Sequence, residues 1–456
     1  MKATIVQPNT LQRDTSSPLY RQIYQRFIQA ITQGSLQPEQ RVPSIRELSN
    51  ELQVSRSTVE SAYTLLLSEG YLEARGQAGT VVSPRLADMA LQSSKSLVPS
   101  PVNVADLSLF DSASATDPLP YQLGLPALDL FPRKLWNTLT VRQLRLQSRH
   151  MSYPQPTGYL PLREAIAAYL QLSRGIHCSP QQVFITAGYR GALSLIGHTL
   201  LQSGDQVWLE DPCFPPSYHL LTQMGAEIVP IPVDQHGMNI AIGKMHAPNA
   251  RFALVTPAHQ SPLGVTLSMT RRQELLTWAE QSHSFIIEDD YDSEFLYDDR
   301  RQPALASLTP NNVLYIGTFS KVLTPALRLA YLVVPHHLLA PFMAACHAWH
   351  DGCPLLQQSV VTNFMQEGHF SRHLRKMRTA YAQRRQMVIE SLNQVFDTHL
   401  QFDTPVGGLH LLAKLNQHED DVALVQHARK HGFGIAALSS RGLGTGCGKG
   451  LLLLQS

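Results

Sequence analysis

Residues 313–321 read VLYIGTFSK, an apolar stretch typical of a buried strand, followed by a turn and a lysine. A lysine that condenses with an aldehyde must be partly neutral and sheltered, and Lys321 at a strand end meets both needs. The hydroxyls of Thr318 and Ser320, together with Arg328, are groups that hold a phosphate. The alternative interpretation is a surface lysine that follows an ordinary turn.

A second stretch, FIIEDDYDSEF at residues 285–295, carries a cluster of carboxylates directly after its apolar part. Burial penalises carboxylates unless a cation lies beside them, and a protonated pyridine nitrogen is such a cation. If the pyridine ring of a cofactor carries this nitrogen, Tyr291 in the same stretch can hydrogen-bond a phenolate oxygen on the same ring. The alternative is a solvated acidic loop. Calcium is not indicated, because the glycine and the spacing of an EF-hand are missing.

Further short apolar runs, at residues 183–185, 207–209 and 253–255, alternate with stretches of helical pattern. This alternation predicts a largely parallel α/β sheet. At 456 residues the chain is too long for one ordinary core, so at least two domains are expected. We assign residues 121–456 to the α/β domain, with a small α/β subdomain at its C-terminal end.

Residues 1–83 predict a separate compact unit of three helices and a hairpin. The first helix is expected to begin at Pro18, where proline is favourable because the first N–H groups of a helix have no intrahelical partner. The second opens with Ser44 and Glu47, the pattern of a capping box. The third begins at Ser55, and two short strands surround the glycine-containing turn that follows it.

This order of elements is that of a winged helix-turn-helix, in which the second helix of the pair enters the major groove of DNA. Arginine reads guanine through two hydrogen bonds, and hydroxyls contact phosphates or bases. The alternative is that the serines only cap a helix and the arginines are solvated. The predicted contacts are Ser44, Arg46, Ser55, Arg56, Ser57, Thr58 and, in the wing, Arg75, Gly79 and Thr80.

The composition excludes several classes of protein. With 43% hydrophobic and 16% charged residues the chain is globular, and no apolar run approaches the roughly 20 residues of a membrane helix. A net charge of +2 is too small to indicate DNA binding, so local arginines must provide it. The start lacks a secretory segment and the five cysteines form no C-x-x-C pair, which predicts a cytoplasmic protein without a metal site. Residues 84–120, rich in Ser, Ala, Pro and Asp, predict a linker.

Long segments carry a family resemblance. The string from LYRQIYQRF to ARGQAGTVV, residues 19–82, resembles the winged helix-turn-helix of the GntR family of bacterial regulators. From residue 121 onward, YPQPTGYLPLREAIAAYL, ITAGYRGAL, LEDPCFPPSY, VTPAHQSPLG, IIEDDYDSEF and GTFSKVLTPALRLAYLV resemble the fold-type I aminotransferases. The combination resembles the MocR subfamily of GntR regulators over nearly all 456 residues.

The resemblance implies pyridoxal phosphate (PLP) as cofactor. It makes Lys321 the internal aldimine, Asp289 the partner of the pyridine nitrogen and Tyr291 the partner of the ring oxygen. Phe214 matches the aromatic residue that stacks on the ring. The phosphate would be held by Gly188, Tyr189 and Arg190 at a helix start, with Thr318, Ser320 and Arg328.

The resemblance leaves two positions open. Aminotransferases use an asparagine to touch the ring oxygen, and either Ser261 or Gln260 must replace it here. A competing interpretation is that His259 and Gln260 only satisfy the backbone of their loop. Arg441 is the best candidate for a clamp on an effector carboxylate, but its glycine-rich surroundings favour a loop arginine that points to solvent.

The expected protein is a head-to-tail homodimer that binds operator DNA at paired half-sites. PLP, or an amino compound that reacts with the Lys321 aldimine, is expected to modulate that binding. The alternative is an active PLP-dependent aminotransferase with an accessory DNA-binding domain. A regulator that has lost its cofactor is hard to reconcile with the joint presence of Lys321, Asp289 and Tyr291.

Overall fold

The computed structural model describes residues 17–85, 118–146, 152–296, 302–349, 351–396, 399–402, 407–415, 419–444 and 448–454. The chain divides into two compact units, Met1–Ser112 and Ala113–Ser456. Most of the predicted linker, residues 84–120, lies outside the described residues, and the predicted boundaries at residues 83 and 121 stay predictions.

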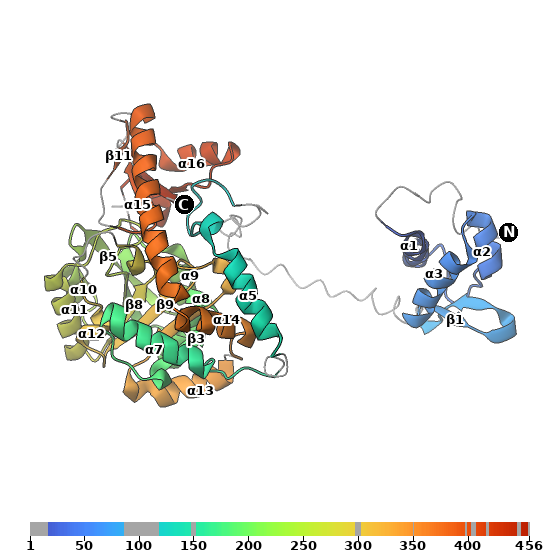
Figure 1. Cartoon of the computed structure of the whole chain (residues 1–456), viewed down its shortest axis with the longest axis horizontal. Helices are drawn as coiled ribbons and strands as arrows, with labels where there is room; N and C mark the ends of the chain where they lie inside the picture. The colour runs from blue at the N-terminus through green and yellow to red at the C-terminus, as the bar shows by residue number, and fades with distance from the viewer. Residues whose placement is uncertain are drawn as a thin grey trace. The chain divides into compact units, whose positions relative to one another are not determined.

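Within residues 17–85 the N-terminal unit has three α-helices and a two-stranded hairpin, in the predicted order (Figure 1). The predicted capping box is present, because Ser44 Oγ accepts the Glu47 N–H and the Glu47 carboxylate accepts the Ser44 N–H. Apolar side chains from all three helices form the core, where Phe27 and Tyr63 pack edge to face. The elements are α1 (Leu19–Thr32), α2 (Ile45–Leu52), α3 (Arg56–Ser68), β1 (Leu72–Ala74) and β2 (Thr80–Val82).

The large unit is built on an eight-stranded sheet with the order β3-β10-β9-β8-β7-β4-β5-β6. Strands β9, β8, β7, β4 and β5 are parallel, whereas β10 is antiparallel to both β9 and β3. Strand β3 therefore runs in the same direction as β9. The strands are β3 (Val183–Thr186), β4 (Gln206–Asp211), β5 (Glu227–Asp234), β6 (Gly237–Met238), β7 (Phe252–Val255), β8 (Phe285–Asp290), β9 (Val313–Thr318) and β10 (Ala330–Val333).

Helices cover both faces of this sheet, because alternate strand residues point to opposite sides. Ile287 and Ile316 pack with α8, α9 and α13, while Ile286 and Tyr315 pack with α7, α11, α14 and α15. The predicted mostly parallel α/β architecture is confirmed. The helices are α5 (Arg133–Leu144), α7 (Leu160–Arg174), α8 (Gly188–Leu200), α9 (Pro215–Gln223), α10 (Ile240–His246), α11 (Met269–Gln281), α12 (Leu305–Leu308), α13 (Leu339–Trp349), α14 (Leu355–Gln366) and α15 (His369–Phe396).

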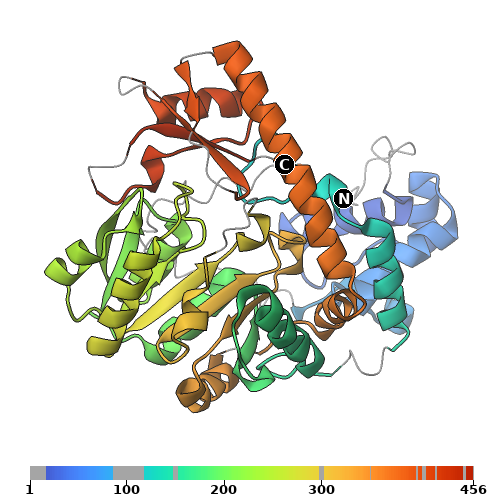
Figure 2. The same cartoon turned by 60° about the vertical axis from the view of Figure 1, so that its left-hand side comes forward.

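The C-terminal part forms a second, smaller sheet. Its four strands are antiparallel in the order β11-β12-β14-β13. Figures 1 and 2 show the long helix α15 running from the region of α14 to this small sheet. Among the described helices, none combines the length and the apolar character that crossing a membrane requires. The elements are β11 (Gln401–Phe402), β12 (His410–Lys414), α16 (Asp421–Lys430), β13 (Ala436–Ala437) and β14 (Gly450–Leu454).

Two glycines with positive φ give a matched test of packing against β3. Gly158 has φ +98°, and an added Cβ would lie 2.3 Å from Ile185 Cγ1. Gly204 has φ +89° with no atom within 4 Å of an added Cβ. We predict that Gly204→Ala lowers stability by about 1 kcal/mol through backbone strain alone. Gly158→Ala should cost about 1–3 kcal/mol more through overpacking.

The comparison requires thermal unfolding of both variants at one heating rate. Equal losses of the melting temperature would contradict the close packing of residue 158 on β3.

Candidate functional site

A cavity of about 490 Å³ lies where the strands of the large sheet end. Because β3, β4, β7, β8 and β9 run in one direction, the segments that follow them meet at the same edge, the usual ligand position of such sheets. All the predicted cofactor residues except Gly188 line it. The lining consists of Leu123, Gly124, Tyr189, Arg190, Phe214, Ser261, Pro262, Asp289, Tyr291, Thr318, Ser320, Lys321, Pro325, Arg328, Leu409, His410, Arg441 and Leu452.

Strand β8 ends in three buried carboxylates, of which two have hydrogen-bond or ion-pair partners within the protein. Glu288 accepts the backbone N–H groups of Leu305 and Ala306 at 3.0 and 2.9 Å. Asp290 pairs with Arg174 at 2.7 Å and accepts the Tyr315 hydroxyl at 2.6 Å. The side chains of Glu288 and Asp290 point to the face covered by α7 and α15, because residues two positions apart on a strand lie on the same side of the sheet.

Asp289 points the other way, into the cavity. Its carboxylate has no hydrogen-bond or ion-pair partner within the described part of the chain. Burial, followed by the nearby carboxylates of Asp290, Glu210 and Asp292, raises its pKa well above the ordinary value, against the opposing effect of Lys321. A cation placed in the cavity would remove this penalty.

Lys321 enters the cavity from the turn after β9. Its Nζ donates to the Gly124 carbonyl at 2.8 Å, and a Cβ at Gly124 would lie 3.3 Å from it. Burial lowers the pKa of this amine against the opposing effect of Asp292 and Asp289. A lowered pKa leaves more of the amine neutral and therefore nucleophilic. The alternative of a surface lysine is wrong.

One end of the cavity is built for an anion. The α8 helix starts there at Gly188, so its unpaired N–H groups and the positive end of its dipole are available. The Arg328 guanidinium lies against Gly188, where an added Cβ would approach it to 3.3 Å, and it donates to the Ala187 carbonyl. Arg190, Thr318 and Ser320 line the same cavity.

The loop after β7 resolves the choice that the sequence left open. Gln260 is buried, and its Nε2 donates to Glu210, to the Pro212 carbonyl and to the Ser261 carbonyl. The Gln260 side chain is thus occupied by hydrogen bonds within the protein, while Ser261 lines the cavity and hydrogen-bonds Tyr291. Of the two, only Ser261 is available to a ligand.

Two aromatic residues form another part of the wall. Phe214 is 37% exposed and packs edge to face with Tyr189, with ring centroids 6.0 Å apart. The Tyr189 hydroxyl is held by Ser217 Oγ at 2.7 Å. The exposed face of Phe214 therefore remains available for stacking.

Arg441 lines the cavity, so the interpretation of a solvent-directed loop arginine is wrong. Its segment is tied to the loop after β4: the Cys213 N–H donates to the Arg441 carbonyl at 3.0 Å, and Asp211 accepts the N–H groups of Leu443 and Gly444. These long-range bonds had no local signal in the sequence. Burial lowers the pKa of the guanidinium, which remains a cation suited to a carboxylate.

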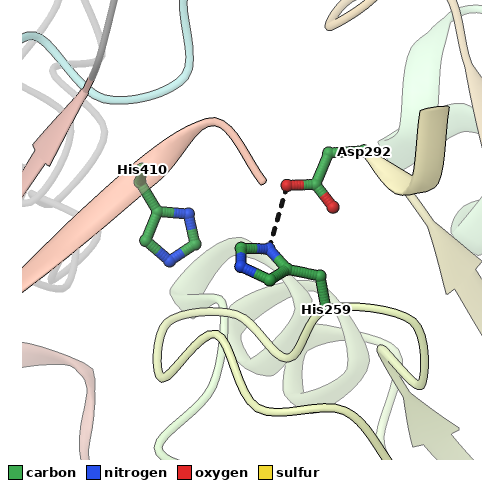
Figure 3. Close-up of side chains that lie close together, drawn as sticks. All are labelled: His259, Asp292 and His410. Carbon is green, nitrogen blue, oxygen red and sulfur yellow. Dashed lines mark ion pairs between the residues drawn. The ribbon is translucent and has the colours of Figure 1, made fainter. Parts of the chain in front are cut away.

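His259, Asp292 and His410 form a buried cluster (Figure 3), and His410 also lines the cavity. His259 Nδ1 is 2.9 Å from Asp292 Oδ2 and 3.0 Å from the Tyr291 hydroxyl. His410 Nε2 donates to the Pro262 carbonyl at 2.9 Å, and burial lowers its pKa to about 4. The donor atoms of His259, Asp292 and His410 lie within 4.8 Å of one another, a spacing also found at metals. The predicted lack of a metal stays a prediction, and the sequence did not reveal this cluster.

In the N-terminal unit the predicted DNA contacts lie mainly on the surface. Ser44, Arg46, Arg56 and Ser57 are exposed at the starts of α2 and α3. Ser55 caps α3 by accepting the Thr58 N–H, so the capping role expected as an alternative is real. It does not compete with DNA binding, because the Arg56 side chain stays exposed.

Arg41 lies beside the predicted wing residues, and the sequence did not indicate it. Arg75 is exposed and pairs with Glu39 at 3.3 Å, while Gly79 and Thr80 are half-buried. The Arg41 guanidinium lies against Gly79, where an added Cβ would lie 2.9 Å from Arg41 Nε. Arg41 is bridged to Val81 of β2, a contact between distant residues that no local pattern reveals.

Glu210 supports the cavity loop and allows a pH test. Its Oε2 accepts the Thr256 N–H and hydroxyl and the Gln260 Nε2, and burial raises its pKa from 4.5 to about 7. The native state thus holds this proton more tightly than the unfolded chain, and Glu210 makes stability fall as pH rises from about 4.5 to 7. Glu210→Gln keeps the acceptor without the charge.

We predict that Glu210→Gln raises the free energy of unfolding by about 2–3 kcal/mol above pH 7 and has little effect at pH 4. Chemical unfolding across this pH range measures the difference, with Glu227→Gln, an exposed glutamate of β5, as control. A gain that is the same at every pH would contradict the buried, charged state of Glu210.

Comparisons with known proteins agree with this geometry. The family of aminotransferases of class I and II matches residues 135–449, and the gntR family of bacterial regulatory proteins matches residues 19–82. The probable rhizopine catabolism regulatory protein MocR of Rhizobium meliloti is 33% identical over 94% of this chain and 88% of its own length. The pyridoxine biosynthesis transcriptional regulator PdxR of Corynebacterium glutamicum is 29% identical over 94% and 90%.

A solved structure gives the same result for the large unit. LysN, the α-aminoadipate aminotransferase of Thermus thermophilus, solved with N-(5'-phosphopyridoxyl)-L-leucine, is 26% identical with a TM-score of 0.68. The match covers 74% of this chain and 87% of that chain. The chain therefore belongs to the GntR family of bacterial regulators, in the MocR-type group that joins a winged helix-turn-helix to an aminotransferase class I and II domain.

Proposed function

We propose that the cavity holds PLP and that this cofactor, or an amino compound reacting with it, modulates the binding of the regulator to operator DNA. The observation that carries the proposal is the buried carboxylate of Asp289, which has no partner within the described residues and faces the cavity that Lys321 enters. Such an arrangement is costly unless a cation occupies the cavity.

The residues around the cavity fit the pyridine nitrogen, the ring oxygen and the aldehyde of PLP. Asp289 supplies an anion for the pyridine nitrogen, and Tyr291 supplies a hydroxyl for the ring oxygen. Lys321 supplies the amine that condenses with the aldehyde. When bound, PLP supplies an electron sink for amino compounds.

The phosphate and the ring also have their partners. The α8 N-terminus at Gly188, Tyr189 and Arg190 lies with Arg328 at the anion end. Thr318 and Ser320 add hydroxyl donors there, while Phe214 provides a face for stacking and Ser261 a hydroxyl beside Tyr291.

The effector proposal rests on Arg441. Its guanidinium shares the cavity with Lys321, so an amino compound with a carboxylate can reach both groups. The leucine adduct bound to LysN shows that the same fold accepts an amino acid joined to the cofactor. An amino acid is therefore the effector class that this cavity supports.

The assembly proposal is a head-to-tail homodimer in the cytoplasm whose two DNA-binding units read paired half-sites. Apolar side chains of Val141, Leu144 and Leu146 are exposed at the end of α5, which provides surface for a second copy. Ser44, Arg46, Ser55, Arg56, Ser57, Thr58, Arg75, Gly79 and Thr80 remain the proposed DNA contacts.

The position of Arg441 also favours a second function, an active aminotransferase. A site with Lys321, Asp289 and a carboxylate clamp has the groups for both half-reactions. Sustained turnover with an amino donor and a keto acid would support this alternative, whereas a single half-reaction would not.

We predict that PLP changes the DNA affinity of the wild type by about fivefold or more, the usual scale of allosteric coupling. Lys321→Ala removes the condensing amine, so its DNA affinity should not respond to PLP. Fluorescence anisotropy on a duplex that the wild type selects from a random pool measures both. Lys244→Ala, an exposed lysine of α10, is the control. Equal responses in wild type and Lys321→Ala would contradict the proposal.

Arg56 allows a separate test of DNA recognition. We predict that Arg56→Ala weakens binding to the selected duplex by about 10- to 100-fold, the value of a lost bidentate base contact. Arg21→Ala removes an exposed arginine of α1 outside the proposed contacts and should change affinity little. A wild-type affinity for Arg56→Ala would show that the start of α3 does not read DNA.

A further inference from the structure

A chain of buried polar groups leads from the protein interior to the cavity. Asp292, His259 and Tyr291 are linked through one atom, His259 Nδ1, which lies 2.9 Å from Asp292 Oδ2 and 3.0 Å from the Tyr291 hydroxyl. Asp292 and His259 are 1% and 2% exposed, whereas Tyr291 reaches the cavity wall. The cofactor residues already assigned do not include His259 or Asp292.

The carboxylate fixes which nitrogen of His259 carries the proton. A carboxylate oxygen accepts hydrogen bonds, so the contact of 2.9 Å between Asp292 Oδ2 and His259 Nδ1 places a hydrogen on Nδ1. The same N–H also faces the Tyr291 oxygen at 3.0 Å. His259 Nε2 is buried with no hydrogen-bond partner within the described residues, so Nδ1 is the ring nitrogen through which His259 makes its polar contacts there.

The Tyr291 oxygen is thereby occupied as an acceptor. It faces the His259 N–H and also hydrogen-bonds Ser261. Burial, with Asp292, Asp289 and Glu210 nearby, raises the pKa of Tyr291 well above its ordinary value, so the hydroxyl keeps its hydrogen. With its acceptor positions filled by the protein, this hydroxyl has its hydrogen left for an acceptor in the cavity.

Strand β12 and the turn before it hold the arrangement rigid. Gly408, at φ +87°, packs so closely on the imidazole of His259 that an added Cβ would lie 2.0 Å from Cε1. Asp292 Oδ2 also accepts the Leu409 N–H at 3.3 Å. Figure 3 shows His259 with Asp292 on one side and His410 on the other. The ring therefore cannot turn away from Tyr291 without displacing the backbone of the small domain.

We propose that Asp292 and His259 are positioning residues that orient the Tyr291 hydroxyl as a hydrogen-bond donor to the ring oxygen of bound PLP. The inference rests on the proposed cofactor site and assigns a role to two residues outside it. A metal held by His259, Asp292 and His410 fits less well, because Nδ1 already faces Asp292 and His410 Nε2 donates to Pro262.

A double-mutant cycle between residues 259 and 291 tests the proposal. The four proteins are wild type, His259→Gln, Tyr291→Phe and the double variant, each in the full chain. Gln fills much of the imidazole volume but places its amide nitrogen near Nε2 rather than Nδ1. His259→Asn, whose amide nitrogen lies near Nδ1, is the rescue variant.

Two readouts are used, neither of which depends on turnover. One is the affinity for PLP, and the other is the pH midpoint of the absorption change of the bound cofactor. The titratable groups that face Tyr291 are Asp289, Asp292, Glu210 and His259, and Lys321, His410 and Arg441 face the same cavity. All of them except residue 259 are unchanged between wild type and His259→Gln.

We expect His259→Gln to weaken PLP binding strongly only where Tyr291 is present. His259→Gln weakens PLP binding about tenfold and raises the pH midpoint by about one unit, since the ring oxygen loses a well-oriented donor. In the Tyr291→Phe background the same substitution changes affinity by less than about twofold. His259→Asn retains most of the wild-type behaviour, and Asp292→Asn repeats the loss if His259→Gln does not fold.

Two outcomes would overturn the proposal. Equal effects of His259→Gln with and without Tyr291 would show that His259 only packs the core. A stoichiometric metal ion whose removal reproduces the loss would show a metal site instead. Failure of the cofactor site itself gives a different result, because the wild type would then bind no PLP or Lys321→Ala would bind it equally well.

Discussion

The arrangement of the large unit depends on the buried carboxylate of Asp289, which has no hydrogen-bond or ion-pair partner among the described residues. Strand β8 carries Glu288, Asp289 and Asp290 in succession, and its alternation sends the first and third to one face and Asp289 to the other. Arg174 and Tyr315 both contact Asp290 Oδ2. Asp289 faces the α8 side of the sheet, where the cavity, the helix N-terminus and Lys321 meet, so its charge defines what can bind there.

Both sheets are needed to complete this cavity. The large sheet supplies the strand ends, while Leu409, His410, Arg441 and Leu452 come from the C-terminal part. Hydrogen bonds from Cys213 and to Asp211 join the Arg441 segment to the loop that carries Phe214. A ligand that contacts both Lys321 and Arg441 thus acts on two substructures at once, which is a physical route by which an effector can shift a conformational equilibrium.

The sequence predicted the features that local patterns control. The capping box of Ser44, the strand before Lys321 and the carboxylates after an apolar run all depend on neighbouring residues, and the structure contains each of them. The sequence could not choose between Gln260 and Ser261, because only the loop conformation decides which side chain reaches the cavity.

Other features depend on contacts between residues far apart in the chain. Arg441 was expected in solvent because its glycine-rich neighbours resemble a surface loop, yet its backbone is anchored to the segment after β4. His410 lies in β12 and His259 in the loop after β7, and the need for glycine at residue 408 is apparent only once the His259 ring is known to pack on it. Gly124, whose carbonyl receives the Lys321 hydrogen bond, was equally hidden.

We propose that the carboxylate of Asp289 pairs with a cation on the bound cofactor. The most direct test is a spectroscopic titration of wild type and Asp289→Asn with PLP, together with thermal unfolding of both proteins without PLP. We predict that Asp289→Asn binds PLP at least about tenfold more weakly, while the free variant is as stable as the wild type or more so because it no longer has to bury a carboxyl group that can ionise. An unchanged affinity for PLP would show that Asp289 does not pair with the cofactor.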